Sequence, residues 1–394
     1  MINKTQLSNF YKNKKVLVTG HTGFKGSWMC MVLDMLGAKV CGYSLEPPTF
    51  PSLFECLGLD KSITSIETID GSENAPSLQS IIGDIRDLDY MQKVFAAFKP
   101  EIVIHMAAQP IVRESYKDPV GTYSSNVMGT VNLLECVRQD MLVAGNIKSV
   151  VNVTTDKVYR NNEWDRGYVE TDFLDGYDPY SNSKSCSELV THSYIQSFFE
   201  APGACEDGAP IVRVSTCRAG NVIGGGDFAA DRIIPDSIRA AGKSEDIIVR
   251  NPYSTRPYEH VLEPLYVYLM IAMKQWQDNT YSSSYNVGPD DESCVTTGNL
   301  VDMFVEKWNS TIDKTEAGTE FAHIKWINKH DGGPHEAGFL KLDCTKLKNT
   351  FDWHPVWNIN TTMDKLIEWY YVYLTGGDVV SFSKQQIEEF LNLI

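Results

Sequence analysis

The sequence lacks the features that mark several classes of protein. Its 394 residues include nine cysteines, an odd number, with no CxxC pair. Neither a disulfide framework nor a zinc site is indicated, and a reducing compartment is expected. The net charge is -16 and basic residues are dispersed, so we expect no nucleic-acid partner. No apolar run approaches the roughly 20 residues of a membrane helix. We therefore expect no membrane partner and a cytoplasmic location.

Alternating apolar patterns predict an α/β fold. A run rich in β-branched residues, "KKVLVTG" at 14–20, is followed by the helical pattern "GSWMCMVLDMLGA" and by a second run, "KVCGYS". Further strand-like runs stand at 101–108, 149–155, 211–219 and 283–288, with helical stretches between most of them. This alternation is typical of a Rossmann-type doubly wound parallel sheet with a smaller C-terminal substrate domain.

The pattern also predicts how the chain is divided. We expect residues 1–220 to form a dinucleotide-binding domain, to which later segments return, and residues 221–394 to form mainly the substrate domain. The stretches 64–80 and 201–210 are small and polar, which predicts surface loops.

A glycine loop follows the first predicted strand. "TGHTGFKG" places Gly20, Gly23 and Gly26 at G-x-x-G-x-x-G spacing before a helix, where glycines allow a tight turn and a close approach to a pyrophosphate. An ordinary strand-to-helix turn would use the same glycines. A P-loop is not indicated, because Lys25 precedes the last glycine. Asp84 in "GDIRD" suits either a contact to adenine or a helix N-cap.

Two further patterns carry chemical groups. Tyr180 and Lys184 are four residues apart, on one helical face, where an ammonium would favour the phenolate and make tyrosine a usable base. "TTDKVY" places Asp156 beside Lys157 directly after the apolar run "SVVNV". Ligands of open α/β sheets bind beyond the carboxyl ends of strands, which favours a functional pair over a solvated turn. Burial raises a carboxyl pKa and lowers an ammonium pKa, so a dry pocket would suit an acid and a base there.

These residues together resemble the extended short-chain dehydrogenase/reductase family. "TGHTGFKG", Asp84, "HMAAQ", Thr155, Tyr180 and Lys184 stand in the order expected of that family. Longer phrases, among them "HMAAQPIVRESY", "GYDPYSNSK" and "RAGNVIGGGDFAADRIIPD", are similar to the nucleotide-sugar 4,6-dehydratases within it, over about residues 12–375. The loops at 64–80 and 201–210 and the final tail differ from the family pattern, which affects surfaces rather than chemistry.

The resemblance implies an NAD-dependent dehydration of a nucleotide-diphosphate hexose. Tyr180 and Thr155 would act at O4 of the sugar, Asp156 would be the acid for the C6 hydroxyl, and Lys157 would be the C5 base, where thymidine-linked relatives carry glutamate. That lysine and the overall similarity favour CDP-glucose as the substrate. A homodimer is expected, with 123–139 as one candidate interface segment.

The resemblance also assigns binding roles. The cofactor residues are Gly20, Gly23, Phe24, Lys25, Gly26, Asp84, Ile85, Ala107, Ala108, Gln109, Tyr180 and Lys184. The substrate residues are Asn221, Arg232, Arg250, Arg256 and His335. Arg250 and His335 fit surface positions equally well. The glycine loop does not separate NAD from NADP, and no metal is expected. A 4-epimerase, or a dehydratase for another nucleotide sugar, remains the alternative, although an epimerase has no use for the Asp-Lys pair.

Overall fold

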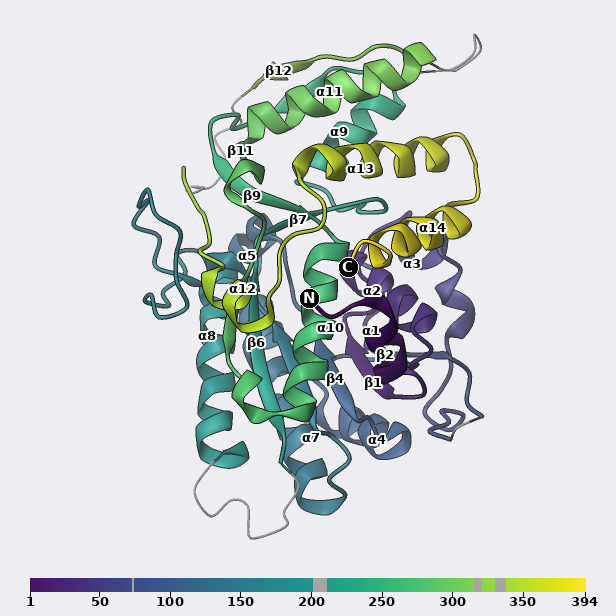
Figure 1. Ribbon diagram of the computed structural model, residues 1–394, viewed down its shortest axis with the longest axis vertical. Helices are drawn as coiled ribbons and strands as arrows, with labels where there is room; N and C mark the ends of the chain where they lie inside the picture. The colour runs from purple at the N-terminus through teal and green to yellow at the C-terminus, as the bar shows by residue number, and fades with distance from the viewer. Residues whose placement is uncertain (73, 201–210, 315–320, 330–337) are drawn as a thin grey trace.

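The computed structural model describes residues 1–72, 74–200, 211–314, 321–329 and 338–394. A parallel sheet of seven strands forms its centre, in the order β10-β6-β5-β4-β1-β2-β3 (Figure 1). Its strands are β1 (Lys15–Thr19), β2 (Lys39–Ser44), β3 (Leu78–Ile82), β4 (Ile102–His105), β5 (Ser149–Val153), β6 (Arg213–Ala219) and β10 (Ser284–Val287). The doubly wound α/β fold predicted from the sequence is confirmed.

Period-two alternation along the strands gives each face of the sheet its own core. Val16 and Val18 of β1 face one apolar cluster, whereas Leu17 faces the other. The first face is covered by α1 (Lys4–Tyr11), α2 (Phe24–Met35) and α10 (Leu262–Gln277). The second is covered by α4 (Leu88–Phe98), α7 (Gly129–Val143) and α8 (Pro179–Tyr194).

Several segments from the C-terminal part of the chain lie beyond the carboxyl ends of the strands, at the top of Figure 1. Two small sheets occur there, one with strand order β11-β9-β7 and one pairing β12 with β8. These strands are β7 (Asn221–Ile223), β8 (Ile247–Val249), β9 (Thr255–His260), β11 (Cys294–Thr296) and β12 (Trp326–Asn328). The helices of this region are α9 (Ile233–Gly242), α11 (Thr297–Lys314) and α13 (Ile359–Leu374). α14 (Val379–Leu391) packs on α13, and α12 (Thr345–Phe351) lies against β10 of the central sheet.

Short helices complete the architecture. They include α3 (Leu53–Cys56), α5 (Val112–Lys117), α6 (Pro119–Tyr123), the π-helical turn Ser124–Met128 that runs into α7, and the 3-10 turn Asp156–Val158 after β5. The prediction of a loop over 64–80 is wrong at its end, because residues 78–80 begin β3. This strand is the edge of the sheet, and its sequence "LQSII" has β-branched residues only in its second half. The predicted loop at 201–210 lies outside the described residues.

Candidate active site

The predicted site residues gather at one end of the central sheet. The glycine loop follows β1, the segment 106–109 follows β4, and "TTDKVY" follows β5, where the parallel strands have their carboxyl ends. The order of the sheet changes direction between β1 and β4. Such a reversal is where open α/β sheets form a crevice for ligands.

The glycine loop is shaped for close backbone approaches. Gly20 has φ +75°, and a Cβ there would stand 2.7 Å from the Ala107 nitrogen. At Gly26 a Cβ would stand 2.1 Å from the Gly20 oxygen, so α2 packs directly on the loop. Gly23 is the N-cap of α2, and a Cβ there would come no closer than 3.4 Å to the surrounding protein. A Cβ at Gly23 would therefore make only an ordinary contact with the loop, so the backbone N–H groups at the helix N-terminus are not blocked by a tight packing contact at this position, as binding of a dinucleotide pyrophosphate requires.

Asp84 follows the edge strand and is held in place by its neighbour. Its carboxylate accepts hydrogen bonds from the Arg86 backbone and from Arg86 Nε, at 2.9–3.0 Å, and these keep its pKa below the usual range. The N-cap of α4 is Asp87, so the capping alternative for Asp84 is wrong. Ile85 is buried, and its carbonyl accepts a hydrogen bond from Asn132 Nδ2.

Hydrogen bonds also fix the segment after β4. Thr19 Oγ1 accepts from the Ala107 nitrogen at 3.2 Å, which ties this segment to the glycine loop. Ala108 is half-buried. The Gln109 side chain donates to Thr122 Oγ1 at 2.9 Å and accepts from the Ile111 nitrogen, so it braces its own loop.

A buried ion pair positions the two ends of "TTDKVY". Glu188 of α8 pairs with Arg218 of β6 at 2.9 Å, and both side chains are almost fully buried. Thr154 Oγ1 donates to the same carboxylate, and Arg218 Nη1 donates to the Tyr159 hydroxyl. Tyr159 in turn donates to Asn286 Oδ1 of β10. The segment between Thr154 and Tyr159 is thus anchored at both ends.

Asp156 and Lys157 differ strongly in their surroundings. Asp156 is only 1% exposed, and burial raises the pKa of its carboxyl, although the nearby Lys157 and Arg256 charges act in the opposite direction. Its Oδ1 accepts from Thr155 Oγ1 at 3.0 Å, whereas Oδ2 has no hydrogen-bond partner among the described residues. Lys157 is half-buried. The pair therefore offers a buried carboxyl group whose pKa is raised, with one oxygen that no described residue occupies.

Tyr180 and Lys184 lie on the buried face of α8, as their spacing predicted. Burial raises the pKa of Tyr180 to about 12, while a hydrogen bond with Thr155 and the charge of Arg232 lower it. Lys184 is 4% exposed and donates to the Val153 carbonyl at 2.9 Å. Burial lowers its pKa to about 7, and the neighbouring Lys25 adds to this effect. Thr155 therefore connects the tyrosine with Asp156.

The predicted substrate arginines occupy different places. Arg232, the N-cap of α9, pairs with Asp227 at 2.9 Å and acts electrostatically on Tyr180. Arg256 of β9 is buried close to Asp156, and Asn221 begins the neighbouring strand β7. Arg250 pairs with Asp231 at 2.8 Å. His335 lies outside the described residues.

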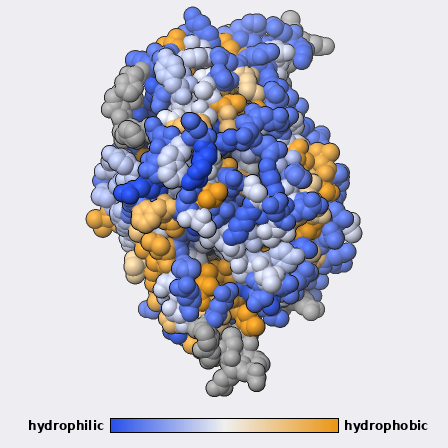
Figure 2. Space-filling model, turned by 60° about the vertical axis from the view of Figure 1, so that its left-hand side comes forward, coloured by the Kyte–Doolittle hydropathy of each residue, from blue (hydrophilic) through white to orange (hydrophobic). Residues whose placement is uncertain are grey.

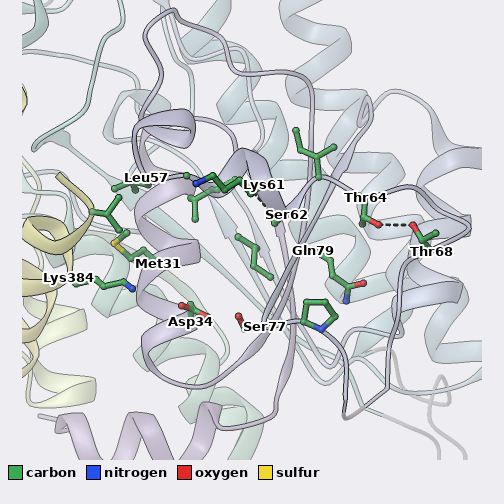
Figure 3. Close-up of a pocket in the computed structure, with 16 residues that line it drawn as sticks. Met31, Asp34, Leu57, Lys61, Ser62, Thr64, Thr68, Ser77, Gln79 and Lys384 are labelled. Atoms are coloured by element: carbon green, nitrogen blue, oxygen red, sulfur yellow. Dashed lines mark hydrogen bonds between the residues drawn. The ribbon is translucent and has the colours of Figure 1, made fainter. Parts of the chain in front are cut away.

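A cavity of about 570 Å³ lies elsewhere, at the amino-terminal end of β3 (Figure 3). Its lining includes Asp34, Lys61, Ser77, Gln79 and Lys384, and none of the predicted site residues. Within the described part of the chain, no cluster of side chains suits a metal ion and no helix is long and apolar enough to cross a membrane.

Comparison with known proteins places this site in a family. The family model described as GDP-mannose 4,6 dehydratase matches residues 17–366. The chain belongs to this family. It is 44% identical to the CDP-glucose 4,6-dehydratase of Salmonella typhimurium, over 98% of both chains. It is 26% identical to a probable dTDP-glucose 4,6-dehydratase of Sinorhizobium fredii, over 90% of this chain and 92% of the relative.

Solved structures of other proteins share the fold of this chain. The dTDP-glucose 4,6-dehydratase of Bacillus anthracis in complex with NAD has a TM-score of 0.67 at 20% identity, covering 91% of this chain and 96% of the other. The UDP-glucose 4-epimerase of Thermotoga maritima with UDP-glucose also has a TM-score of 0.67, at 18% identity, covering 91% and 99%. These structures share the fold, and the family model together with the 44% identical relative confirms the resemblance to nucleotide-sugar 4,6-dehydratases drawn from the sequence.

For this member of the dehydratase family, sequence reasoning missed two buried groups near the site. His21 of the glycine loop contacts Ser80 and Ser44 through its two ring nitrogens, and burial lowers its pKa to about 3, so it is neutral. Glu259 of β9 is buried within electrostatic range of Lys25 and Asp156. The tertiary fold brings β9 close to the glycine loop, so the local sequence around Glu259 does not predict a place for this residue near the site.

Proposed function

We propose that the protein is a CDP-glucose 4,6-dehydratase that uses NAD and forms CDP-4-keto-6-deoxyglucose. The observation that carries this proposal is the Asp156–Lys157 pair at the end of β5, where a buried carboxylate oxygen of Asp156 has no hydrogen-bond partner among the described residues. The nucleotide is proposed from the relative that is 44% identical over nearly its full length.

The glycine loop and the segments after β3 and β4 are proposed to hold the cofactor. The glycines of the loop and the N-terminus of α2 suit a pyrophosphate, and Lys184 lies where the Tyr180 helix meets the end of β5. NAD held there would supply the acceptor for the hydride from C4 of the sugar and, after water loss, the hydride donor for C6.

Tyr180 and Thr155 are proposed to act at the sugar O4. Tyr180 as phenolate removes the O4 proton while Thr155, which already bonds the tyrosine, shares the hydrogen bond to that oxygen. The charge of Arg232 favours the phenolate, which burial alone disfavours.

Asp156 and Lys157 are proposed to remove water from the resulting 4-keto sugar. The ketone acidifies C5, so Lys157 takes the C5 proton, and the electron pair forms the C5–C6 double bond as the C6 hydroxyl leaves. Asp156, whose pKa is raised by burial, supplies the proton to that hydroxyl. Water is the leaving group, and no external oxidant is consumed.

Cationic side chains above the sheet are proposed to bind the diphosphate. Arg232 and Arg256 reach the catalytic segment from α9 and β9, as binding of a diphosphate-linked sugar there requires. Asn221 is proposed to assist them, and Arg250 and His335 are proposed as peripheral contacts. Residues 1–220 would then bind mainly the cofactor and residues 221–394 mainly the substrate.

A homodimer in the cytoplasm completes the proposal. Exposed apolar side chains on α5, α6 and the turn into α7 include Tyr116, Val120, Tyr123 and Met128. Figure 2 brings the α8 side of the molecule forward, and apolar side chains gather on its lower part. Paired helices of two subunits would cover such a surface. A sedimentation measurement that gives a monomer mass would contradict this part.

Mass spectrometry tests the proposed function. The protein is mixed with NAD and, separately, with CDP-, dTDP-, UDP- and GDP-linked glucose in deuterated water. Loss of water with one incorporated deuteron from CDP-glucose alone is the expected result. Loss of water from another sugar nucleotide would correct the substrate, and an epimer without loss of water would refute the dehydratase assignment.

A further inference from the structure

The proposed mechanism does not use the loop that continues the catalytic segment. This loop covers residues 160–168 and follows Tyr159 directly. Glu163 in the loop has φ +52°, a backbone conformation that residues other than glycine seldom adopt. Such a conformation is costly and persists where the surrounding contacts hold it. The loop is therefore built around contacts that fix its shape.

Asn161 supplies several of these contacts. Its Oδ1 accepts hydrogen bonds from the Glu163 nitrogen at 2.8 Å and from the Tyr168 hydroxyl at 2.9 Å. A backbone N–H can only donate, so the amide atom that faces it is the oxygen, and the other atom is the nitrogen. That Nδ2 donates to the Phe339 carbonyl at 3.0 Å, 178 residues away along the chain. The Asn161 side chain thus joins its own loop to a distant segment.

The distant segment, residues 338–343, lies between the loop and β9. On the loop side, Glu163 Oε1 accepts a hydrogen bond from the Gly338 nitrogen at 2.6 Å. On the other side, the Gly338 carbonyl accepts from the Thr255 nitrogen at 3.0 Å. Thr255 is the first residue of β9 and precedes the buried Arg256. The segment therefore connects the loop after β5 with the strand that carries this arginine.

The far end of the segment is fixed to the central sheet. The Tyr168 nitrogen donates to the Lys341 carbonyl, and the Asp343 nitrogen donates to the Tyr168 carbonyl, both at 2.9 Å. Asn286 Nδ2 of β10 donates to the carbonyls of Tyr168 and Asp343, at 2.7 and 3.0 Å. The Tyr168 ring also stacks on Tyr159, with ring centroids 5.3 Å apart. The end beside β9 is held instead by the side-chain contacts of the loop.

We propose that Asn161 is a positioning residue: through segment 338–343 it holds the start of β9, so that Arg256 is placed to bind the diphosphate of the sugar nucleotide. This inference rests on the proposed function, in which Arg256 contacts the diphosphate. Asn161 itself touches neither the substrate nor the reacting atoms. Its replacement should therefore weaken substrate binding and leave the chemical steps unchanged.

Steady-state kinetics test this inference, with saturating NAD and the sugar nucleotide that the wild type dehydrates, expected to be CDP-glucose. Asn161→Asp keeps the oxygen that the loop needs but replaces the Nδ2 donor by an oxygen, which faces the Phe339 carbonyl and repels it. One hydrogen bond contributes roughly 2- to 12-fold to an equilibrium, so KM should rise by about tenfold while kcat and NAD affinity stay within about threefold.

Asn162→Asp is the matched control, because it adds the same charge one residue further on. The Asn162 side chain is exposed and bonds within its own loop, to the Arg160 carbonyl. Its KM should stay within about twofold of the wild-type value, since an exposed charge contributes little.

The same substitution in an Arg256→Met background shows whether Asn161 acts through Arg256. If it does, Asn161→Asp should raise the KM of that background by less than about threefold. An equal rise in both backgrounds would overturn the inference, because a general loss of structure does not depend on Arg256. An unchanged KM in the single variant, or a kcat that falls as much as KM rises, would also overturn it.

Glu163→Ala is the second variant if Asn161→Asp does not fold. It removes the acceptor of the Gly338 nitrogen, so KM should rise by about fivefold, and again by less than about twofold in the Arg256→Met background. An unchanged KM would overturn the inference. An active wild type with unaffected variants refutes this inference alone, whereas a wild type that dehydrates no sugar nucleotide refutes the proposed function and this inference with it.

Discussion

Replacing Asp156 by asparagine should separate the oxidation of the sugar from the loss of water. The asparagine side chain would keep an oxygen to accept the Thr155 hydrogen bond, seen at 3.0 Å, but it would have no acidic proton to give to the C6 hydroxyl. A positioned general acid contributes about 10²- to 10⁴-fold, so the rate of water loss should fall by that factor. Oxidation at C4 should change by less than about threefold, because Tyr180 and Thr155 are intact.

Rapid-quench mass spectrometry measures both events, since the 4-keto sugar that still carries its C6 hydroxyl differs in mass from the dehydrated product. Asp175→Asn is the matched control, because the Asp175 carboxylate is only partly buried and is paired with Arg160. In the wild type, water loss should also decline as pH rises through the raised pKa of Asp156, since the acid form disappears. A variant that dehydrates within about threefold of the wild-type rate would refute the acid role.

Three further perturbations test other parts of the account. Lys157→Met should slow exchange of the C5 hydrogen with deuterated water by at least about 100-fold, measured by NMR, and an unchanged exchange rate would remove its role as base. Arg256→Met should raise the substrate KM by about 10- to 100-fold through the loss of a charged contact, whereas the exposed Arg239→Met control should not; an unchanged KM would remove Arg256 from the site. Glu263 has a folded-state pKa of about 8 because of burial. The folded chain therefore keeps a proton that the unfolded chain loses near pH 4.5, so the free energy of unfolding should fall as the pH rises from about 5 to 8. Urea titrations at several pH values should show a smaller fall for Glu263→Gln. An equal dependence on pH in both proteins would contradict the buried, protonated state of Glu263.

The sequence was sufficient for the parts of the site that depend on local spacing. The glycine loop and "TTDKVY" each follow a strand that the sequence predicts, because the preceding apolar run is rich in β-branched residues. Both strands, β1 and β5, are almost fully buried in the structure. The face shared by Tyr180 and Lys184 follows from helical spacing alone. The edge strand β3 was only partly anticipated, because its polar first half does not look like a buried strand.

Contacts made by the tertiary fold could not be predicted. The approach of Arg232 to Tyr180 and of Arg256 to Asp156 depends on where α9 and β9 pack above the sheet. The same is true of the buried Arg218–Glu188 pair, whose partners belong to β6 and α8. The sequence alone does not distinguish a surface position or a phosphate contact for Arg218 from a structural role. Its burial and its contacts with Glu188 and Tyr159 show that it anchors the catalytic segment.

Deuterium at C4 of CDP-glucose provides the most direct test of the central claim, which is an internal redox cycle around water loss. The product is isolated after turnover with unlabelled NAD, and NMR locates the label. The account predicts that the deuterium leaves C4 and appears at C6 of the 4-keto-6-deoxy sugar, with a solvent hydrogen at C5. Deuterium that stays at C4, or that is lost from the sugar while C6 keeps its hydroxyl, would contradict the account.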